Sequence, residues 1–290
     1  MSKIKIAELF YSIQGEGRYM GVPSVFLRTF GCNFKCAGFG MERGRLSSEA
    51  EEIAEIAHMF TKYEELPLVS TGCDSYASWH PDFKDLSPML TSDAIVDRIM
   101  EIIPHNEWHD EHLVITGGEP LLGWQRAYPD LLSHPKMANL KEITFETNGT
   151  QPLSKEFRHY LLDWTLNPKH TANGRRGYDA LTFSVSAKLP ASGEKWEDAI
   201  CPEVVCGYEF VGHTYLKFVV ATEQDVADAE CAIGAYRAAG FKGDVYLMPV
   251  GGVESVYNLN NKNVALAAMK RGLRYSDRLQ VPLFKNEWGT

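Results

Sequence analysis

Cys32 and Cys36 lie four residues apart in a glycine-containing loop, the run FGCNFKCAGFGM of residues 30–41. Such a C-x3-C pair fits structural zinc, a redox pair or two ligands of an iron–sulfur cluster, and by itself does not distinguish them. A third cysteine, Cys73, follows after a further 36 residues. Three thiolates on a four-iron cluster leave one iron open. That iron can bind the amino and carboxylate groups of S-adenosylmethionine (SAM), whose sulfonium the cluster reduces to release a 5′-deoxyadenosyl radical.

Polar residues gather at the ends of three segments that we expect to be strands. Thr116–Glu119 lie at the end of HLVIT, Glu146–Asn148 come directly after KEITF, and Ser186 and Lys188 follow LTFSV. Parallel α/β folds bind ligands at the carboxyl ends of their strands. A single group of this kind would pass for ordinary turn residues, but three of them predict a ligand site at one edge of the sheet.

The elements that position these residues alternate between strand and helix patterns. We expect strands over residues 4–10, 24–29, 112–116, 141–147, 179–186, 215–220 and 244–249. We expect helices over residues 47–62, 91–103, 124–134, 223–240 and 260–272. This alternation predicts a parallel sheet, and one continuous core suggests a barrel or partial barrel. We therefore expect a single domain over residues 1–290, with an insertion at about 37–72 that carries its own helix.

Composition and charge exclude several classes of protein. The net charge of −9 and pI of about 5.5 disfavour a large phosphate-backbone footprint, so we expect no direct nucleic-acid binding. The start MSKIKIAELF enters a strand pattern without a secretory signal, and we find no apolar run of about 18 residues to span a membrane. We expect a cytoplasmic protein, whose cysteines are ligands or buried thiols rather than disulfides. We expect Cys201, Cys206 and Cys231, which lie far from the other three cysteines in the sequence, to be structural or incidental.

The cysteines and strand ends together resemble the radical SAM superfamily. Its usual motif is C-x3-C-x2-C, but the third position here is Phe39, so Cys73 would complete the set after the insertion. The run Thr116–Pro120 (TGGEP) resembles the motif that contacts the SAM amino group. The resemblance implies a partial (β/α)6-type TIM barrel, a [4Fe-4S] cluster and bound SAM. The residues implied to bind SAM are Gly117, Gly118, Glu119, Glu146, Asn148, Ser186, Lys188 and Met248.

A narrower resemblance covers nearly the whole chain. The runs FYSIQGEG (10–17), G-x-P-x-x-F-x-R (21–28), GCN (31–33) and RLQVPLFKNEWGT (278–290) are similar to 7-carboxy-7-deazaguanine synthases. These are radical SAM lyases that make the 7-deazaguanine precursor of queuosine and related bases. The resemblance implies that 6-carboxy-5,6,7,8-tetrahydropterin undergoes a radical ring contraction to 7-carboxy-7-deazaguanine with loss of ammonia.

The same resemblance assigns residues to the substrate and to Mg²⁺. Glu16 suits the pterin edge, Arg28 suits the substrate carboxylate, and Gln14 can donate and accept. Ser75 stands where the family has a Mg²⁺-binding threonine, and it keeps the hydroxyl oxygen that Mg²⁺ prefers. Two departures are the long insertion and Ser-Ala-Lys at residues 186–188, where the family has Ser-Pro-Lys. The residues implied to bind substrate are Ile13, Gln14, Gly15, Glu16, Arg28, Thr116 and Thr290.

The resemblance further implies an electron donor such as flavodoxin or ferredoxin, and a homodimer. Two other functions are weighed against it. One is a radical SAM activase that makes a glycyl radical on a protein partner, which the glycine-rich run at residues 14–23 disfavours because it suits a small pterin pocket. The other is a zinc-binding structural or interaction protein, which would be colourless after anaerobic reconstitution.

Overall fold

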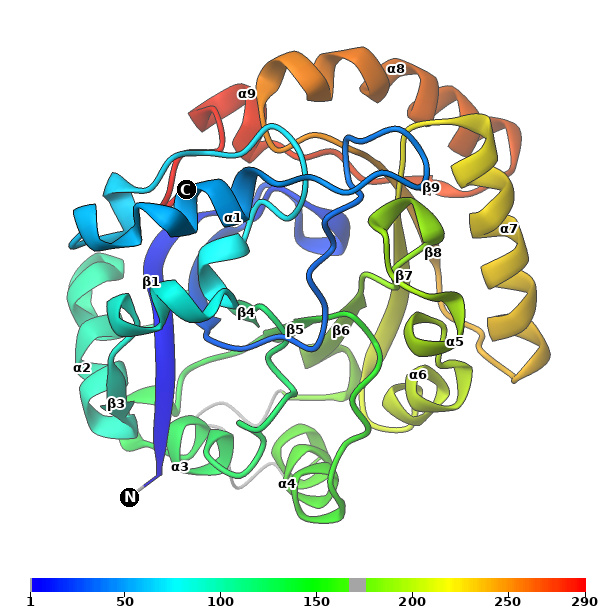
Figure 1. The fold of residues 1–290 in the computed structure, drawn as a ribbon. Coiled ribbons are helices and arrows are strands. Elements are labelled where there is room, and N and C mark those ends of the chain that lie inside the picture. The colour runs from blue at the N-terminus through cyan, green and yellow to red at the C-terminus, as the bar shows by residue number, and fades with distance from the viewer. Residues whose placement is uncertain (1, 167–175) are drawn as a thin grey trace.

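The computed structural model describes residues 2–166 and 176–290. Within these ranges, nine strands form one sheet in the order β3-β1-β2-β4-β5-β6-β7-β8-β9. From β2 onward every strand is parallel to its neighbour, and helices lie on the outer side of the curved sheet (Figure 1). This arrangement confirms the expected α/β partial barrel.

The described strands are β1 Lys3–Ile13, β2 Pro23–Thr29, β3 Met89–Thr91, β4 His112–Gly117, β5 Ile143–Thr147, β6 Leu181–Val185, β7 His213–Val220, β8 Val245–Pro249 and β9 Arg274–Tyr275. The described α-helices are α1 Glu49–Glu55, α2 Ser92–Ile102, α3 Tyr128–Leu132, α4 Lys155–Leu166, α5 Trp196–Ala199, α6 Pro202–Glu209, α7 Glu223–Ala238, α8 Glu254–Lys270 and α9 Gln280–Phe284.

The central strands are buried on both faces. Every residue of β4, β6 and β8 except Gly117 is buried, as expected for strands of a parallel sheet covered by helices. The predicted parallel orientation is wrong at the β3 edge of the sheet, because β1 pairs antiparallel with both β2 and β3. A short connection joins β1 to β2, and only antiparallel neighbours can be joined so briefly.

The bounds of the expected helices are confirmed for some and wrong for others. α2 begins after Thr91, whose hydroxyl accepts the Ala94 amide proton at 3.3 Å, as its capping pattern predicts. The helix expected over residues 47–62 is wrong in length. α1 ends at Glu55 and buries none of its residues, so little packing supports its extension. α3 is likewise shorter than the expected 124–134, and α8 begins at Glu254 instead of residue 260.

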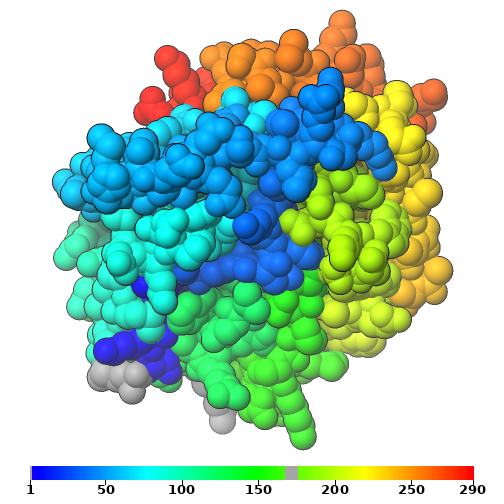
Figure 2. All heavy atoms as spheres, in the orientation of Figure 1, coloured from blue at the N-terminus to red at the C-terminus, as the bar shows by residue number. Residues whose placement is uncertain are grey.

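The expected insertion, residues 37–72, closes on itself. Its two ends are joined by a hydrogen bond from the Gly72 amide to the Phe39 carbonyl, and within its first part the Ser47 amide donates to the Ala37 carbonyl; both bonds are 2.7 Å long. In Figure 2 it forms a band across the visible face and reaches α7, where Arg43 pairs with Asp228 at 2.8 Å. These contacts return the chain at residue 73 to the neighbourhood of Cys36.

Glu49 binds the segment with which the insertion returns to the cysteines, at Ser70 and Thr71. Its carboxylate accepts protons from the amides and hydroxyls of Ser70 and Thr71 at 2.5 to 3.1 Å. Although partial burial opposes ionisation, these hydrogen bonds lower the pKa of Glu49. Because the folded state lowers this pKa, the stabilisation is present at neutral pH and declines as the pH falls through the lowered pKa.

Replacing Glu49 with alanine is expected to lower the free energy of unfolding by about 1 to 2 kcal/mol at neutral pH, because four donors lose a charged acceptor near solvent. Urea unfolding measures the change, and the matched control is Glu55→Ala at an exposed position of α1. The difference between the two variants should shrink on acidification. Equal stability of the two variants at pH 7 would contradict this role of Glu49.

Within residues 2–166 and 176–290, no helix combines the length and the apolar character needed to cross a membrane.

Candidate functional site

A cavity of about 250 Å³ lies at the carboxyl ends of the parallel strands. Its walls come from every strand from β1 to β8 except β3, and from the insertion and the C-terminal tail. Of the site residues expected from the sequence, all line this cavity except Glu119. The structure therefore brings together side chains that are up to 277 positions apart in the sequence, from Ile13 to Thr290.

The three cysteines lie at one end of the cavity. Cys32, Cys36 and Cys73 are all free thiols, and they pack in one small cluster with Phe34, Phe39 and Ala199. The distant Cys73 thus reaches the other two across the insertion. No three His, Cys, Asp or Glu side chains of the described ranges converge on a position for one metal ion. A four-iron cluster does not require this, because each thiolate binds a different iron.

Burial makes all three thiols difficult to ionise without a metal. It raises the pKa of Cys32 to about 12, that of Cys36 well above the usual thiol value, and that of Cys73 above it. Neighbouring thiolates oppose each other's ionisation further. Three soft, mutually close thiols that become thiolates only beside a cation fit an iron–sulfur cluster.

The end of β4 packs directly on the cysteine loop. A side chain at Gly118 would meet the Gly31 carbonyl oxygen and lie 2.8 Å from the Cβ of Cys32. Gly117 has a φ of +150° and equally little room, so both positions require glycine. The backbone of the TGGEP run therefore lines the cavity beside the cysteines.

Glu119 lies behind this wall rather than in the cavity. It is fully buried, and its carboxylate accepts protons from the Leu121 amide at 3.0 Å, the Thr147 hydroxyl at 2.8 Å and the Asn148 amide at 2.6 Å. These bonds tie the end of β4 to the end of β5. Burial nevertheless raises the pKa of Glu119 to about 7. In this structure Glu119 braces two cavity-lining segments.

The raised pKa of Glu119 predicts a pH-dependent stability. A carboxyl whose pKa is higher in the folded state binds protons preferentially there, so stability falls as the pH rises from about 4.5 to about 7. The loss amounts to about 3 kcal/mol over this interval. Thermal unfolding of the metal-free protein between pH 4 and 8 measures it, with Glu119→Gln as the comparison. A variant with the same pH profile as the wild type would show that another group titrates.

Glu16 stands at the other end of the cavity, between two cations. Its carboxylate pairs with the Lys217 ammonium, with the Arg278 guanidinium at 3.2 Å and with the Gln280 amide at 2.8 Å. Burial alone would raise the pKa of Glu16, but the two cations hold it at about 2. Glu16 is therefore a carboxylate at any physiological pH, able to accept protons from a bound ligand.

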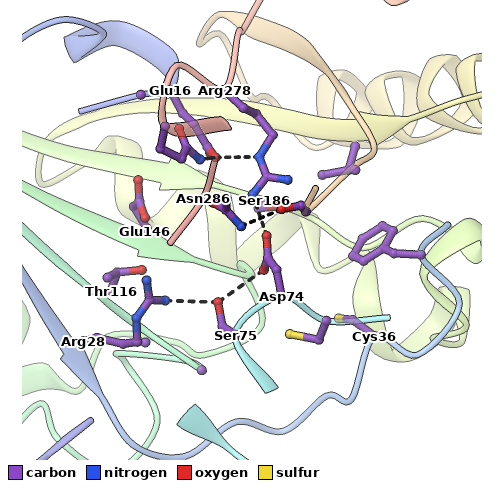
Figure 3. A pocket seen from close by; sticks show the side chains of 18 of the residues that line it. Glu16, Arg28, Cys36, Asp74, Ser75, Thr116, Glu146, Ser186, Arg278 and Asn286 are labelled. Carbon is purple, nitrogen blue, oxygen red and sulfur yellow. Dashed lines mark hydrogen bonds and ion pairs between the residues drawn. The ribbon is translucent and has the colours of Figure 1, made fainter. Parts of the chain in front are cut away.

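Arg278 joins Glu16 to the segment that follows the third cysteine. Its Nη2 lies 2.5 Å from Asp74 Oδ2, and its Nη1 donates to the Gly251 carbonyl after β8. Ser75 Oγ accepts a proton from Arg28 at 3.0 Å and donates to Asp74 at 3.3 Å. Figure 3 shows Arg278 between Glu16 and Asp74, and Ser75 between Arg28 and Asp74. One polar network thus runs from the expected pterin site to the expected Mg²⁺ residue.

The remaining expected residues fill the wall between these two ends. The Gln14 amide donates to Glu146 at 3.1 Å, and the Lys188 ammonium donates to Ser186 at 3.0 Å. Asn148 is held by Asn33, to which its amide donates at 2.9 Å. Met248, Thr116, Ile13 and Gly15 also face the cavity.

The C-terminal tail closes the cavity beside the insertion. Trp288 donates its indole proton to the Leu66 carbonyl at 2.8 Å, and the Gly289 amide donates to Glu8 at 3.2 Å. Glu8 also pairs with Arg28 at 2.7 Å. Thr290 therefore lies at the cavity wall.

Sequence reasoning missed five charged residues that line this cavity: Glu8, Asp74, Lys217, Arg278 and Glu287. Lys217 carried a usable signal, since a lysine inside the otherwise apolar strand YLKFVV is buried at a cost that needs a partner. Asp74 follows Cys73 directly, and Arg278 opens the C-terminal run already noted. Glu8 carried no local signal, because an alternating strand accommodates a glutamate on its solvent face.

Comparison with known proteins gives consistent full-length similarity. No protein-family profile matches the chain. A 7-carboxy-7-deazaguanine synthase of Halobacterium salinarum is 30% identical over 300 residues, which cover 98% of this chain and 91% of that protein. The corresponding protein of Rhodopirellula baltica is 27% identical, covering 100% and 90%. The crystal structure of QueE from Escherichia coli superposes with a TM-score of 0.54 at 19% identity, covering 94% of this chain and 93% of that one.

Proposed function

Because the chain belongs to the 7-carboxy-7-deazaguanine synthase family, we propose that it converts 6-carboxy-5,6,7,8-tetrahydropterin into 7-carboxy-7-deazaguanine and ammonia. The family makes it a radical SAM enzyme of the lyase type that uses a [4Fe-4S] cluster and SAM. The observation that supports this reaction most is the cavity itself, which has three free thiols at one end and a paired carboxylate at the other.

Cys32, Cys36 and Cys73 would hold the cluster. When bound, the cluster and SAM supply the 5′-deoxyadenosyl radical that starts the rearrangement. The chain contributes to the SAM site through the backbone of Gly117 and Gly118, which packs against the cysteine loop and lines the cavity beside the thiols. The side chains proposed to hold the rest of SAM are Glu146, Asn148, Ser186, Lys188 and Met248. Glu119 would act on SAM only through the backbone that it braces.

Glu16 and Arg28 are proposed to orient the substrate. Lys217 and Arg278 keep Glu16 ionised, so it accepts protons from the N–H groups of the pterin edge. Gln14 and Thr116 supply neutral donors and acceptors beside it, and Ile13, Gly15 and Thr290 shape the wall. Arg28 presents a guanidinium for the substrate carboxylate. Fixed at both ends, the substrate meets the radical in one orientation.

We also propose that Mg²⁺ binds at Ser75. Hydroxyl and carboxylate oxygens of Ser75 and Asp74 are the hard ligands that Mg²⁺ prefers, and both line the cavity. The Ser75 oxygen accepts a proton from Arg28 and has a second lone pair that can bind a metal ion.

Three further features complete the proposal. Residues 37–72 form an insertion within one radical SAM domain, and the hydrogen bond between Gly72 and Phe39 at the two ends of the insertion supports this. The electron is supplied by a small redox protein such as flavodoxin or ferredoxin. The enzyme acts as a homodimer, which sedimentation would test.

An anaerobic assay tests the proposed reaction. The reconstituted protein is incubated with the carboxy-tetrahydropterin, SAM, Mg²⁺ and dithionite, and 7-carboxy-7-deazaguanine and ammonia are quantified. We expect both products in equal amounts, with slower turnover when Mg²⁺ is omitted. A colourless protein that binds one zinc ion, or a brown protein that forms no product from this substrate, would overturn the proposal.

A further inference from the structure

Glu194 reaches the cysteine loop from the segment that follows β6. It follows β6 on a turn formed by Pro190–Ser192 and Gly193, and it is 158 positions from Cys36 in the sequence. One carboxylate oxygen, Oε1, accepts the backbone protons of both Lys35 at 2.9 Å and Cys36 at 2.7 Å. No role for Glu194 follows from the sequence motifs or from the reaction.

Two consecutive amides that point at one anion form a backbone nest, which needs a residue in the left-handed region. Cys36 supplies it, with a φ of +51° that is unfavourable for a residue other than glycine. The carboxylate of Glu194 offsets this cost, because it binds the two amide protons only while the loop keeps this shape.

The same turn touches the loop at a second point. The Gly38 amide donates to the Ser192 carbonyl at 2.8 Å, and a side chain at Gly38 would lie 2.6 to 2.7 Å from backbone atoms of residues 191–193. The turn also follows Lys188, whose cation faces all three cysteines and opposes the negative charge that Glu194 places near Cys36. The turn therefore holds the loop and sets the local charge.

We propose that Glu194 is a positioning residue for the iron–sulfur cluster, which holds Cys36 in its ligating conformation and adds a negative charge beside it. This inference rests on the proposed cluster. Glu194 would have two separable effects. Its hydrogen bonds fix the conformation of the ligand Cys36, and its negative charge makes the cluster harder to reduce, since the reduction potential of a cluster depends on the local charge.

Three variants of the full-length protein separate these effects. Glu194→Ala removes both the acceptor and the charge, Glu194→Gln keeps an acceptor oxygen without the charge, and Glu197→Ala is the control at an exposed position of the next helix, α5. Each is reconstituted anaerobically, checked for folding by circular dichroism, and exposed to an iron chelator. Iron release and the midpoint potential of the cluster are then measured.

We expect Glu194→Ala to release iron about ten times faster than the wild type, because charge-assisted hydrogen bonds to the loop are lost. Glu194→Gln should release iron near the wild-type rate but show a less negative midpoint potential. Glu197→Ala should match the wild type in both. If Glu194→Ala keeps its iron as long as Glu197→Ala, the inference is overturned while the proposed function stands. A wild-type protein that binds no iron would overturn both.

Discussion

Replacing Cys73 with alanine leaves the protein without a stable iron–sulfur cluster. Cys73 is the third thiol of the set at one end of the cavity, and it is half-buried beside Cys32 and Cys36. With two thiolates remaining, the cluster loses the ligand to one iron, and no other cysteine of the described ranges lines the cavity to replace it. We expect product formation to fall below detection, a loss of about a thousandfold or more, since the radical has no other source.

Iron and sulfide analysis after anaerobic reconstitution checks this prediction. The wild type should contain about four of each per chain. The matched control is Cys231→Ala, which removes an exposed thiol from α7 and should leave the cluster content unchanged. A Cys73→Ala protein with wild-type iron and sulfide would show that Cys73 is not a ligand.

Replacing Lys217 with methionine is expected to destabilise the protein by about 3 to 5 kcal/mol, because a buried carboxylate loses a buried ion-pair partner. Lys217 is only 4% exposed, and it pairs directly with Glu16. Arg278 remains beside Glu16, but it also pairs with Asp74 and cannot fully compensate for the lost ammonium. Urea unfolding measures the loss, and exposed Lys195→Met is the control.

The double variant Glu16→Gln/Lys217→Met separates stability from substrate binding. Because both charges of the pair are removed, we expect it to be about 1 to 3 kcal/mol more stable than Lys217→Met alone. Its KM for the pterin should nevertheless stay raised, since the carboxylate proposed to bind the pterin edge is gone. Additive effects of the two substitutions on stability would show that the pair is not coupled. A wild-type KM in the double variant would remove Glu16 from the substrate site.

The sequence alone predicted the parallel core of the fold well. Strands such as HLVIT and LTFSV are short apolar runs between turn signals, and their burial depends on a local pattern that the sequence shows directly. The antiparallel β1 and the short α1 were not predicted. The direction of a strand depends on its neighbours, and the length of a surface helix depends on packing that no local pattern records.

The sequence by itself determined which chemistry is available. It contains the cysteines of a cluster, the TGGEP run and the glutamate and arginine proposed for the substrate, because residue types and short spacings are properties of the chain. Only the tertiary structure decided which charges act together. The ion pairs among Glu16, Asp74, Lys217 and Arg278 join residues that are 201 to 262 positions apart, and Glu194 reaches Cys36 from 158 positions away.

The sequence could not show which charges act together, because hydrogen bonds and ion pairs have a short range. Hydrogen bonds and ion pairs act over a few ångströms, and folding sets those separations independently of distance along the chain. The state of Glu16 therefore depends on two cations contributed by β7 and the C-terminal segment, and the state of Glu119 depends on the burial that β4 and β5 create. The residues were present in the sequence, but their ionisation was fixed by the fold.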